Sequence, residues 1–105
     1  MTPGRTSLAG LIVFGLLSVP ARAETIQVTI DKLVFAPVEV SAKVGDTIEW
    51  INKDALAHTA TATNGDWNVD IAPSQRGKIV LKKPGPADYF CKFHPNMKGR
   101  VVVAP

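Results

Sequence analysis

The sequence contains one cysteine, Cys91, among its 105 residues. A single thiol cannot close an internal disulfide, so the disulfide framework that holds many small exported domains together is excluded. The chain also has only two histidines, His58 and His94, and two methionines, Met1 and Met97. Any metal site built from sulfur and imidazole must use these side chains, because there is almost no spare ligand of either kind.

The sequence also lacks a large excess of either positive or negative charge. Twelve Lys and Arg residues stand against nine Asp and Glu residues, which gives a net charge of +3. Two of the basic residues, Arg5 and Arg22, belong to the N-terminal leader, so ten basic residues remain against nine acidic ones, about +1, without it. Proteins that bind nucleic acid carry a strongly basic surface, so we expect no nucleic-acid partner.

No apolar run is long enough to span a bilayer. The run from Leu8 to Val19 has 12 residues, whereas a spanning helix needs about 20. It follows Arg5 and precedes Ala21-Arg22-Ala23, a small-x-small cleavage pattern. We therefore predict a signal peptide over residues 1–23, and a periplasmic domain over residues 24–105 that is not inserted stably in the membrane. The alternative is a leader that stays attached as an anchor.

Alternating apolar and polar residues predict β-strands along most of this domain. Turn signals separate them, and no helical periodicity is present. Residues 66–75 show no sustained pattern, and we expect a loop or an irregular edge segment there. The fold class predicted is all-β, a Greek-key antiparallel β-sandwich. The expected strands are Thr25–Ile30, Val38–Val44, Thr47–Asn52, His58–Thr63, Gly77–Lys82, Ala87–Cys91 and Gly99–Ala104.

Cys91, His94 and Met97 follow one another at intervals of three residues between the last two expected strands. Two imidazoles, one thiolate and a weakly bound thioether are the ligand set of a blue-copper centre. His58 heads the fourth expected strand, and a Greek-key sandwich can open both connections at one end. We predict that His58, Cys91, His94 and Met97 bind one copper ion, which cycles between Cu(II) and Cu(I).

Each of these residues also has an ordinary structural interpretation. Cys91 could be a small buried apolar residue, His58 a core or surface histidine, and Met97 a gap-filler in the core. Zinc shares the His and Cys ligands, but it would leave Met97 without a role. The joint spacing in an exported, strand-rich domain favours copper.

Three segments resemble the cupredoxins, the type 1 blue copper proteins, and among them the amicyanin group. They are Val44–Asn52, Ala57–Ala60 and Tyr89–Val103. The Cys-x-x-His-x-x-Met spacing is the short ligand segment typical of that group. The resemblance implies a periplasmic one-electron carrier in which Asn52 braces the ligand segment and His94 is the ligand nearest solvent.

The resemblance also implies redox protein partners, with a donor such as a periplasmic dehydrogenase and an acceptor such as a c-type cytochrome or an oxidase. The carrier is expected to be a monomer. An apolar patch around His94 is expected to form the docking face. That patch consists of Ala55, Leu56, Ala57, Phe93 and Pro95.

Two positions depart from the amicyanin pattern. Lys92 stands where a small or hydroxylated residue is usual, and Asn96 stands where the residue tends to be apolar. Both touch the expected docking face, so they weaken an assignment of methylamine dehydrogenase as the partner.

Two other function classes use similar residues. An enzyme with Cys91 as nucleophile would need an accessible thiolate, a base and an orienting group, and no orienting group other than Asn52 is evident. A periplasmic copper carrier or delivery protein would favour a thioether-rich site, and the mature chain has one methionine. The protein is therefore expected not to be an enzyme, with copper delivery as the alternative function.

Overall fold

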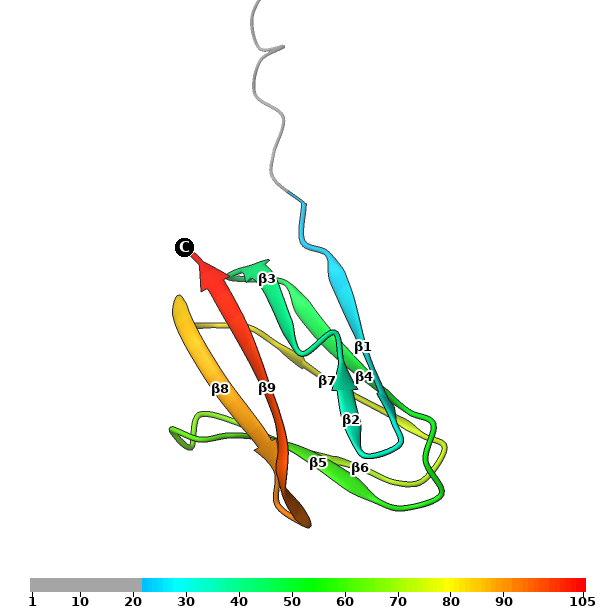
Figure 1. Cartoon of the computed structure of the whole chain (residues 1–105). Coiled ribbons are helices and arrows are strands. Elements are labelled where there is room, and N and C mark those ends of the chain that lie inside the picture. The colour runs from blue at the N-terminus through cyan, green and yellow to red at the C-terminus, as the bar shows by residue number, and fades with distance from the viewer. Residues whose placement is uncertain (1–21) are drawn as a thin grey trace, which may run out of the picture.

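The structure is a computed structural model, and it describes residues 22–105 (Figure 1). Nearly all of the predicted signal peptide lies outside these residues, so the peptide and its cleavage site stay predictions. Residues 22–105 form strands and turns only. Over that range, no helix has the length and apolar character needed to cross a membrane.

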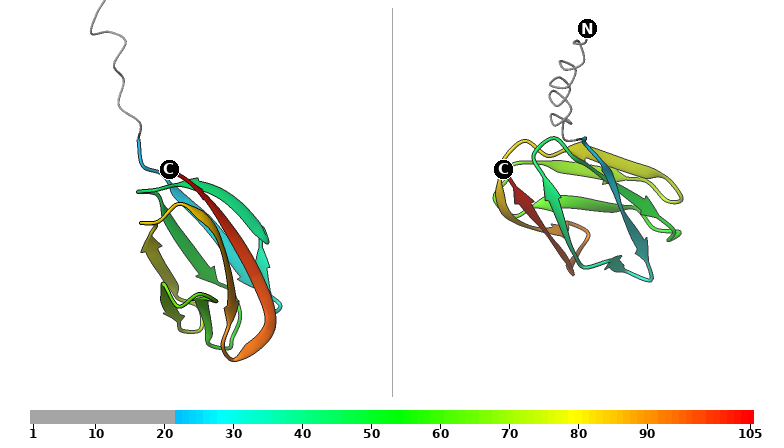
Figure 2. Two further views of the ribbon diagram at one scale, coloured as in Figure 1. Left: turned by 90° about the vertical axis from the view of Figure 1, so that its left-hand side faces the viewer. Right: turned by 90° about the horizontal axis from the view of Figure 1, so that it is seen from above.

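Nine strands form two sheets that pack face to face (Figures 1 and 2). One sheet has the order β2-β1-β4-β7 and the other the order β3-β9-β8-β5-β6. The predicted Greek-key sandwich is confirmed. The strands are β1 (Thr25–Asp31), β2 (Val34–Ala36), β3 (Glu39–Lys43), β4 (Thr47–Asn52), β5 (His58–Ala62), β6 (Asn68–Ile71), β7 (Arg76–Val80), β8 (Gly85–Cys91) and β9 (His94–Ala104).

The structure adds three features to the strand prediction. β2 and β6 are short strands that the alternation did not reveal, and β6 forms an edge of its sheet within the segment expected to be a loop or irregular edge. Two strand pairs, β1 with β4 and β3 with β9, are parallel, so the sheets are mixed and not wholly antiparallel as the sequence predicted. Period-two alternation shows which residues face the core, but not the direction of the neighbouring strand.

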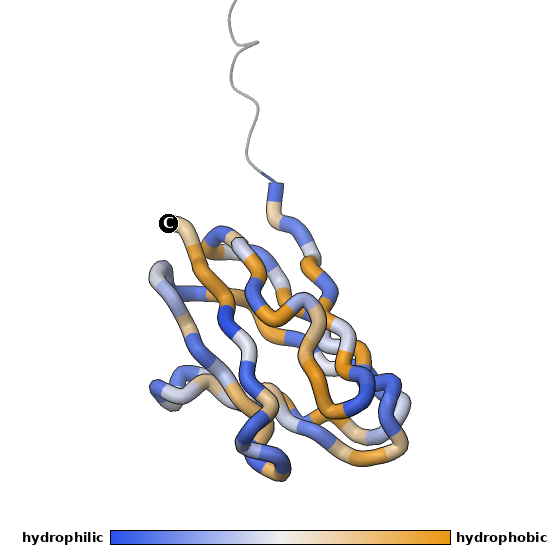
Figure 3. The backbone as a smooth tube through the Cα atoms, viewed as in Figure 1, coloured by the Kyte–Doolittle hydropathy of each residue, from blue (hydrophilic) through white to orange (hydrophobic). Residues whose placement is uncertain are grey.

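The core lies between the two sheets, and the alternation predicted its members. Ile48 and Trp50 of β4 are fully buried, as expected from their spacing of two. The Trp50 indole N–H donates to the Tyr89 hydroxyl at 3.2 Å, and both rings pack against Trp67. Figure 3 shows hydrophobic and hydrophilic residues alternating along the strands that cover this core.

Asp46 joins three segments at the end of the sandwich near the C-terminus. Its carboxylate accepts hydrogen bonds from the Glu24 N–H at 2.9 Å and the Lys43 N–H at 2.9 Å, and the Thr47 N–H donates to the Glu24 carbonyl. The two bonds to the carboxylate lower the pKa of Asp46, although burial acts in the opposite direction. They anchor the start of β1 beside β4.

Gly99 is predicted to be intolerant of a side chain. It lies directly opposite Tyr89 in the β8–β9 pairing, and a Cβ atom there would fall 2.5 Å from the tyrosine hydroxyl oxygen. Tyr89 is buried and its hydroxyl is held by Trp50, so the ring cannot yield. We expect Gly99→Ala to cost about 1–3 kcal/mol of unfolding free energy, measured by urea titration. The exposed neighbour Lys98→Ala is the control, and equal midpoints for the two variants would contradict the packing argument.

Asp46 should make stability depend on acid pH. Because its pKa in the folded protein lies below the ordinary value of 3.8, its contribution is complete above that value and is lost as pH falls through the folded pKa. Asp46→Asn should therefore lower the urea midpoint at pH 7 and reduce the further loss on acidification.

Cleavage after Ala23, as predicted, would turn the Glu24 nitrogen into a charged α-amino group beside this carboxylate. Asp46→Asn should then destabilise a chain that begins at Glu24 more than one that retains Ala23. Equal losses in the two chains would show that the charge of the terminus does not act through Asp46.

Candidate metal centre

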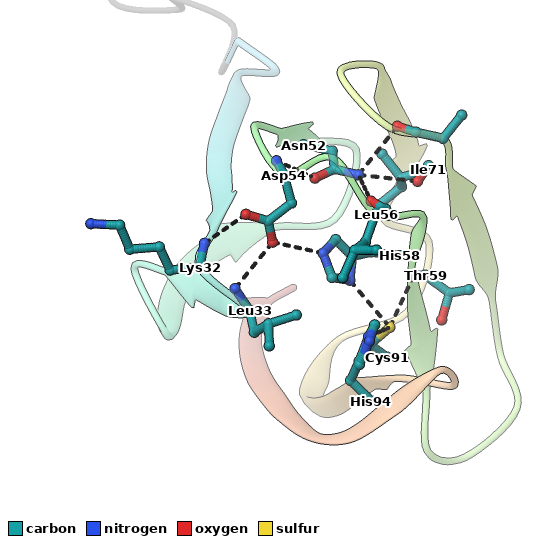
Figure 4. A network of polar contacts seen from close by, with 11 residues as sticks. Lys32, Leu33, Asn52, Asp54, Leu56, His58, Thr59, Ile71, Cys91 and His94 are labelled. Carbon is teal, nitrogen blue, oxygen red and sulfur yellow. Dashed lines mark hydrogen bonds and ion pairs between the residues drawn. The ribbon is translucent and has the colours of Figure 1, made fainter.

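Three of the four predicted ligands meet at one end of the sandwich, where β5 begins and β8 passes into β9 (Figure 4). The Cys91 Sγ lies 3.7 Å from the His58 Nδ1 and 3.7 Å from the His94 Nδ1. All three potential ligand atoms lie within 4.8 Å of one another. His58 and Cys91 are fully buried, whereas His94 is half-buried.

These distances suit a metal ion bound between the three atoms. With metal–sulfur bonds of about 2.3 Å and metal–nitrogen bonds of about 2.0–2.1 Å, sulfur and nitrogen lie about 3.5–3.8 Å apart across tetrahedral to trigonal angles. The observed separations of 3.7 Å fall within that interval. The donor set of one thiolate and two imidazoles fits copper, and the spacing alone would also accept zinc.

The segment that carries Cys91 and His94 is shorter and more regular than expected. The sequence predicted a loop up to Gly99, but β9 begins at His94 and only a two-residue turn separates it from β8. Phe90 pairs with Lys98, whereas Cys91 pairs with His94, so residues 95–97 form a bulge on β9. Such bulges re-aim side chains next to functional sites. Here the bulge brings His94 back beside Cys91.

Thr59 links the two sides of the site. Its backbone N–H donates to the Cys91 Sγ at 3.3 Å, while its hydroxyl accepts from the Lys92 N–H at 2.9 Å. Thr59 follows His58 in β5, and the same short segment therefore positions an imidazole and a donor to sulfur. The sequence analysis did not assign Thr59 a role.

Asp54 fixes the orientation of His58. Its Oδ2 lies 2.8 Å from the His58 Nε2. A carboxylate accepts the ring N–H, so Nε2 carries the proton and Nδ1 is left free to face Cys91. The sequence analysis missed this role, although an acidic residue four positions before a histidine was visible.

Asp54 also holds the turn between β1 and β2. Its carboxylate accepts the N–H groups of Lys32 at 2.7 Å and Leu33 at 3.1 Å, and both residues have positive φ angles, 54° and 64°. Side chains disfavour that conformation, so the two bonds help to maintain it. Burial acts to raise the pKa of Asp54, but the bonds from Leu33, His58 and Lys32 outweigh it, and the pKa is lowered.

Asn52 braces a different segment from the one expected. Its side-chain N–H groups donate to the carbonyls of Leu56, Ile71 and Ala72, and its oxygen accepts the Asp54 N–H at 2.9 Å. The side chain therefore supports the loop between β4 and β5, which leads into His58, and not the segment from Cys91 to Met97. Asn52 is 2% exposed, so these hydrogen bonds are shielded from water.

Met97 is 4% exposed and packs in the hydrophobic core. It occupies the last position of the β9 bulge, two residues before Gly99. Its place on the same short segment as His94 is compatible with the predicted axial role, which stays a prediction.

Comparisons with known proteins agree with this geometry. Residues 5–103 match the model of the cupredoxin-like domain. Amicyanin-alpha of Methylorubrum extorquens is 35% identical over 79% of this chain and 75% of its own length. Amicyanin of Paracoccus versutus is 31% identical over 77% of this chain, and the match spans 66%, just under two thirds, of that protein.

The crystal structure of amicyanin from Paracoccus versutus matches 83% of this chain and 86% of its own, with a TM-score of 0.66 and 32% identity. Sequence, fold and site thus lead to one assignment. The chain belongs to the cupredoxin-like family and is amicyanin-like within it.

Proposed function

We propose that this protein is a periplasmic type 1 copper protein that carries one electron at a time between redox partners. His58, Cys91, His94 and Met97 would hold the copper ion. The observation that carries the proposal is the convergence of two imidazole Nδ1 atoms on a buried cysteine sulfur, each at 3.7 Å. When bound in such a set, copper supplies a one-electron Cu(II)/Cu(I) couple.

The surrounding residues favour electron transfer because they hold the ligands still. Asp54 fixes the orientation of the His58 ring. Asn52 fixes the loop that contains Asp54 and leads into His58. Thr59 donates to the cysteine sulfur and fixes the start of the turn that follows. Ligands that keep their positions in both oxidation states need little rearrangement when the electron moves.

The burial of the site argues against an enzyme. Cys91 is fully buried, whereas a nucleophilic thiolate must be reached by its substrate.

His94 is the half-buried ligand, and the exposed side chains of Leu56 and Phe93 lie on the segments next to the site. This face gives an electron a short route to a partner.

Copper delivery is the second candidate. The accessibility of His94 favours it, because exchange of the ion would have to begin there. The complete burial of His58 and Cys91 opposes rapid release. We therefore place electron transfer first.

The copper assignment can be tested by spectroscopy. The protein loaded with Cu(II) should show intense visible absorption and a narrow copper hyperfine splitting in the EPR spectrum, because the Cys91 thiolate bonds covalently to the ion. Both signals should disappear in Cys91→Ala and persist in Lys92→Ala, which alters a neighbouring exposed side chain. A weakly absorbing spectrum in the unmodified protein would contradict the proposal.

The role of Asp54 can be tested separately. Asp54→Asn should weaken copper binding by about 10–100-fold, measured by competition with a chelator, because the His58 ring loses its carboxylate partner. Asp31→Asn changes an exposed carboxylate at the same end and serves as the control. If both variants bind copper equally well, Asp54 does not support the ligand.

A further inference from the structure

Four lysines lie on segments next to the metal centre, and none of them forms an ion pair within the described residues. They are Lys32, Lys53, Lys92 and Lys98, and all four are exposed. Ion pairs within residues 22–105 involve Lys43, Arg76, Lys83, Arg100 and His58, and none of the four lysines. The cations at this end are therefore available to another molecule.

The backbone places each lysine close to the site. Lys32 is tied to Asp54 through its N–H, and its side chain points away from the network (Figure 4). Lys53 lies between Asn52 and Asp54, and its N–H donates to the Ile30 carbonyl. Lys92 follows Cys91, and its N–H donates to the Thr59 hydroxyl.

Lys98 follows the β9 bulge and faces solvent between two buried neighbours, Met97 and Gly99. The four lysines thus come from four segments at this end of the sandwich: the β1–β2 turn, the β4–β5 loop, the β8–β9 turn and the first half of β9.

Negative charge at this end is smaller. Asp54 is largely shielded and is committed to His58 and two N–H groups. Asp31, Asp70 and Asp88 are exposed carboxylates on strands that reach this end, and Asp88 is paired with Arg100. Arg76 also lies at this end and is paired with Glu49. The four lysines therefore outnumber the exposed carboxylates that form no ion pair at this end of the described residues. The domain without its predicted leader carries only about +1. The positive charge is therefore a local feature of the face over the metal centre.

The same face has an apolar middle. Leu56 is 52% exposed and Phe93 is 59% exposed, and each lies next to a segment that carries a ligand. Exposed apolar side chains with a polar rim mark protein interaction sites. Lysines around that rim favour a partner of opposite charge, because complementary potentials steer encounter and fix orientation.

We propose that this face docks an acidic redox protein, whose carboxylates surround its own redox centre and meet Lys32, Lys53, Lys92 and Lys98. Leu56 and Phe93 then close the contact over His94. The proposal rests on the electron-transfer function proposed above and adds the chemistry of the partner. It also gives Lys92, a departure from the amicyanin pattern, a function.

The test uses the copper-loaded protein and the reduced soluble domain of cytochrome b5 as an acidic haem protein. One variant carries Lys→Gln at the four proposed positions. The control carries Lys→Gln at Lys43, Lys78, Lys82 and Lys83, which removes the same charge from elsewhere on the molecule. Stopped-flow absorption gives the second-order rate constant at ionic strengths of about 10 mM and 300 mM. Attraction between exposed charges is weakly screened at the lower value and strongly screened at the higher one. Uncharged hydroquinone serves as a second reductant.

With cytochrome b5, we expect the rate constant of the unmodified protein to fall as ionic strength rises. The variant at the proposed positions should react about tenfold more slowly at low ionic strength, and the control within about twofold of the unmodified protein. Equal slowing of the two variants, or a rate constant that rises with ionic strength, would overturn the proposal.

Hydroquinone separates this proposal from the function on which it rests. It should reduce all three proteins at similar rates, because it carries no charge. If it reduces them normally while the lysines have no effect with cytochrome b5, only the docking face is refuted. If it fails to reduce the unmodified protein, the electron-transfer function itself fails.

Discussion

The Asp54 carboxylate holds together the segments on which the metal centre depends. One of its oxygens faces the His58 ring, and the carboxylate also receives the N–H groups of Lys32 and Leu33 from a turn about 20 residues earlier in the chain. The side-chain oxygen of Asn52 accepts the backbone N–H of Asp54 and so holds Asp54 in place. A change in the β1–β2 turn would therefore alter the position of His58, a proposed ligand, although that turn contains none of the four proposed ligands.

The site has a closed side and an open side, and their difference suits a protein that passes electrons. His58 and Cys91 are fully buried, and this burial excludes water and substrate from the sulfur. Thr59, which follows His58, donates its backbone N–H to that sulfur. His94 is supplied by a tight strand-to-strand turn and reaches the surface between exposed apolar side chains. A rigid interior and one accessible edge follow from placing ligands on strands rather than on a long loop.

Much of this arrangement could be predicted from the sequence, because its signals are local. The alternation from Thr47 to Asn52 gave the bounds and the buried face of β4, and the spacing of Cys91 and His94 identified two residues that do meet. The parallel pairing of β1 with β4 and the bond from Asp54 to His58 depend on contacts between distant segments. Neither leaves a periodic signal, and β2 and β6 are too short to produce one.

The same contacts explain how so small a domain can bury a metal site. A buried imidazole without a hydrogen bond would cost about 1–3 kcal/mol, as polar groups in protein interiors do. Asp54 satisfies the Nε2 of His58, and the described residues contain no buried side-chain nitrogen or oxygen without a partner. The imidazole orientation is thus set by the protein's own hydrogen bonds. The side chains therefore need little rearrangement when the ion binds, and the free energy of binding adds to the stability of the fold.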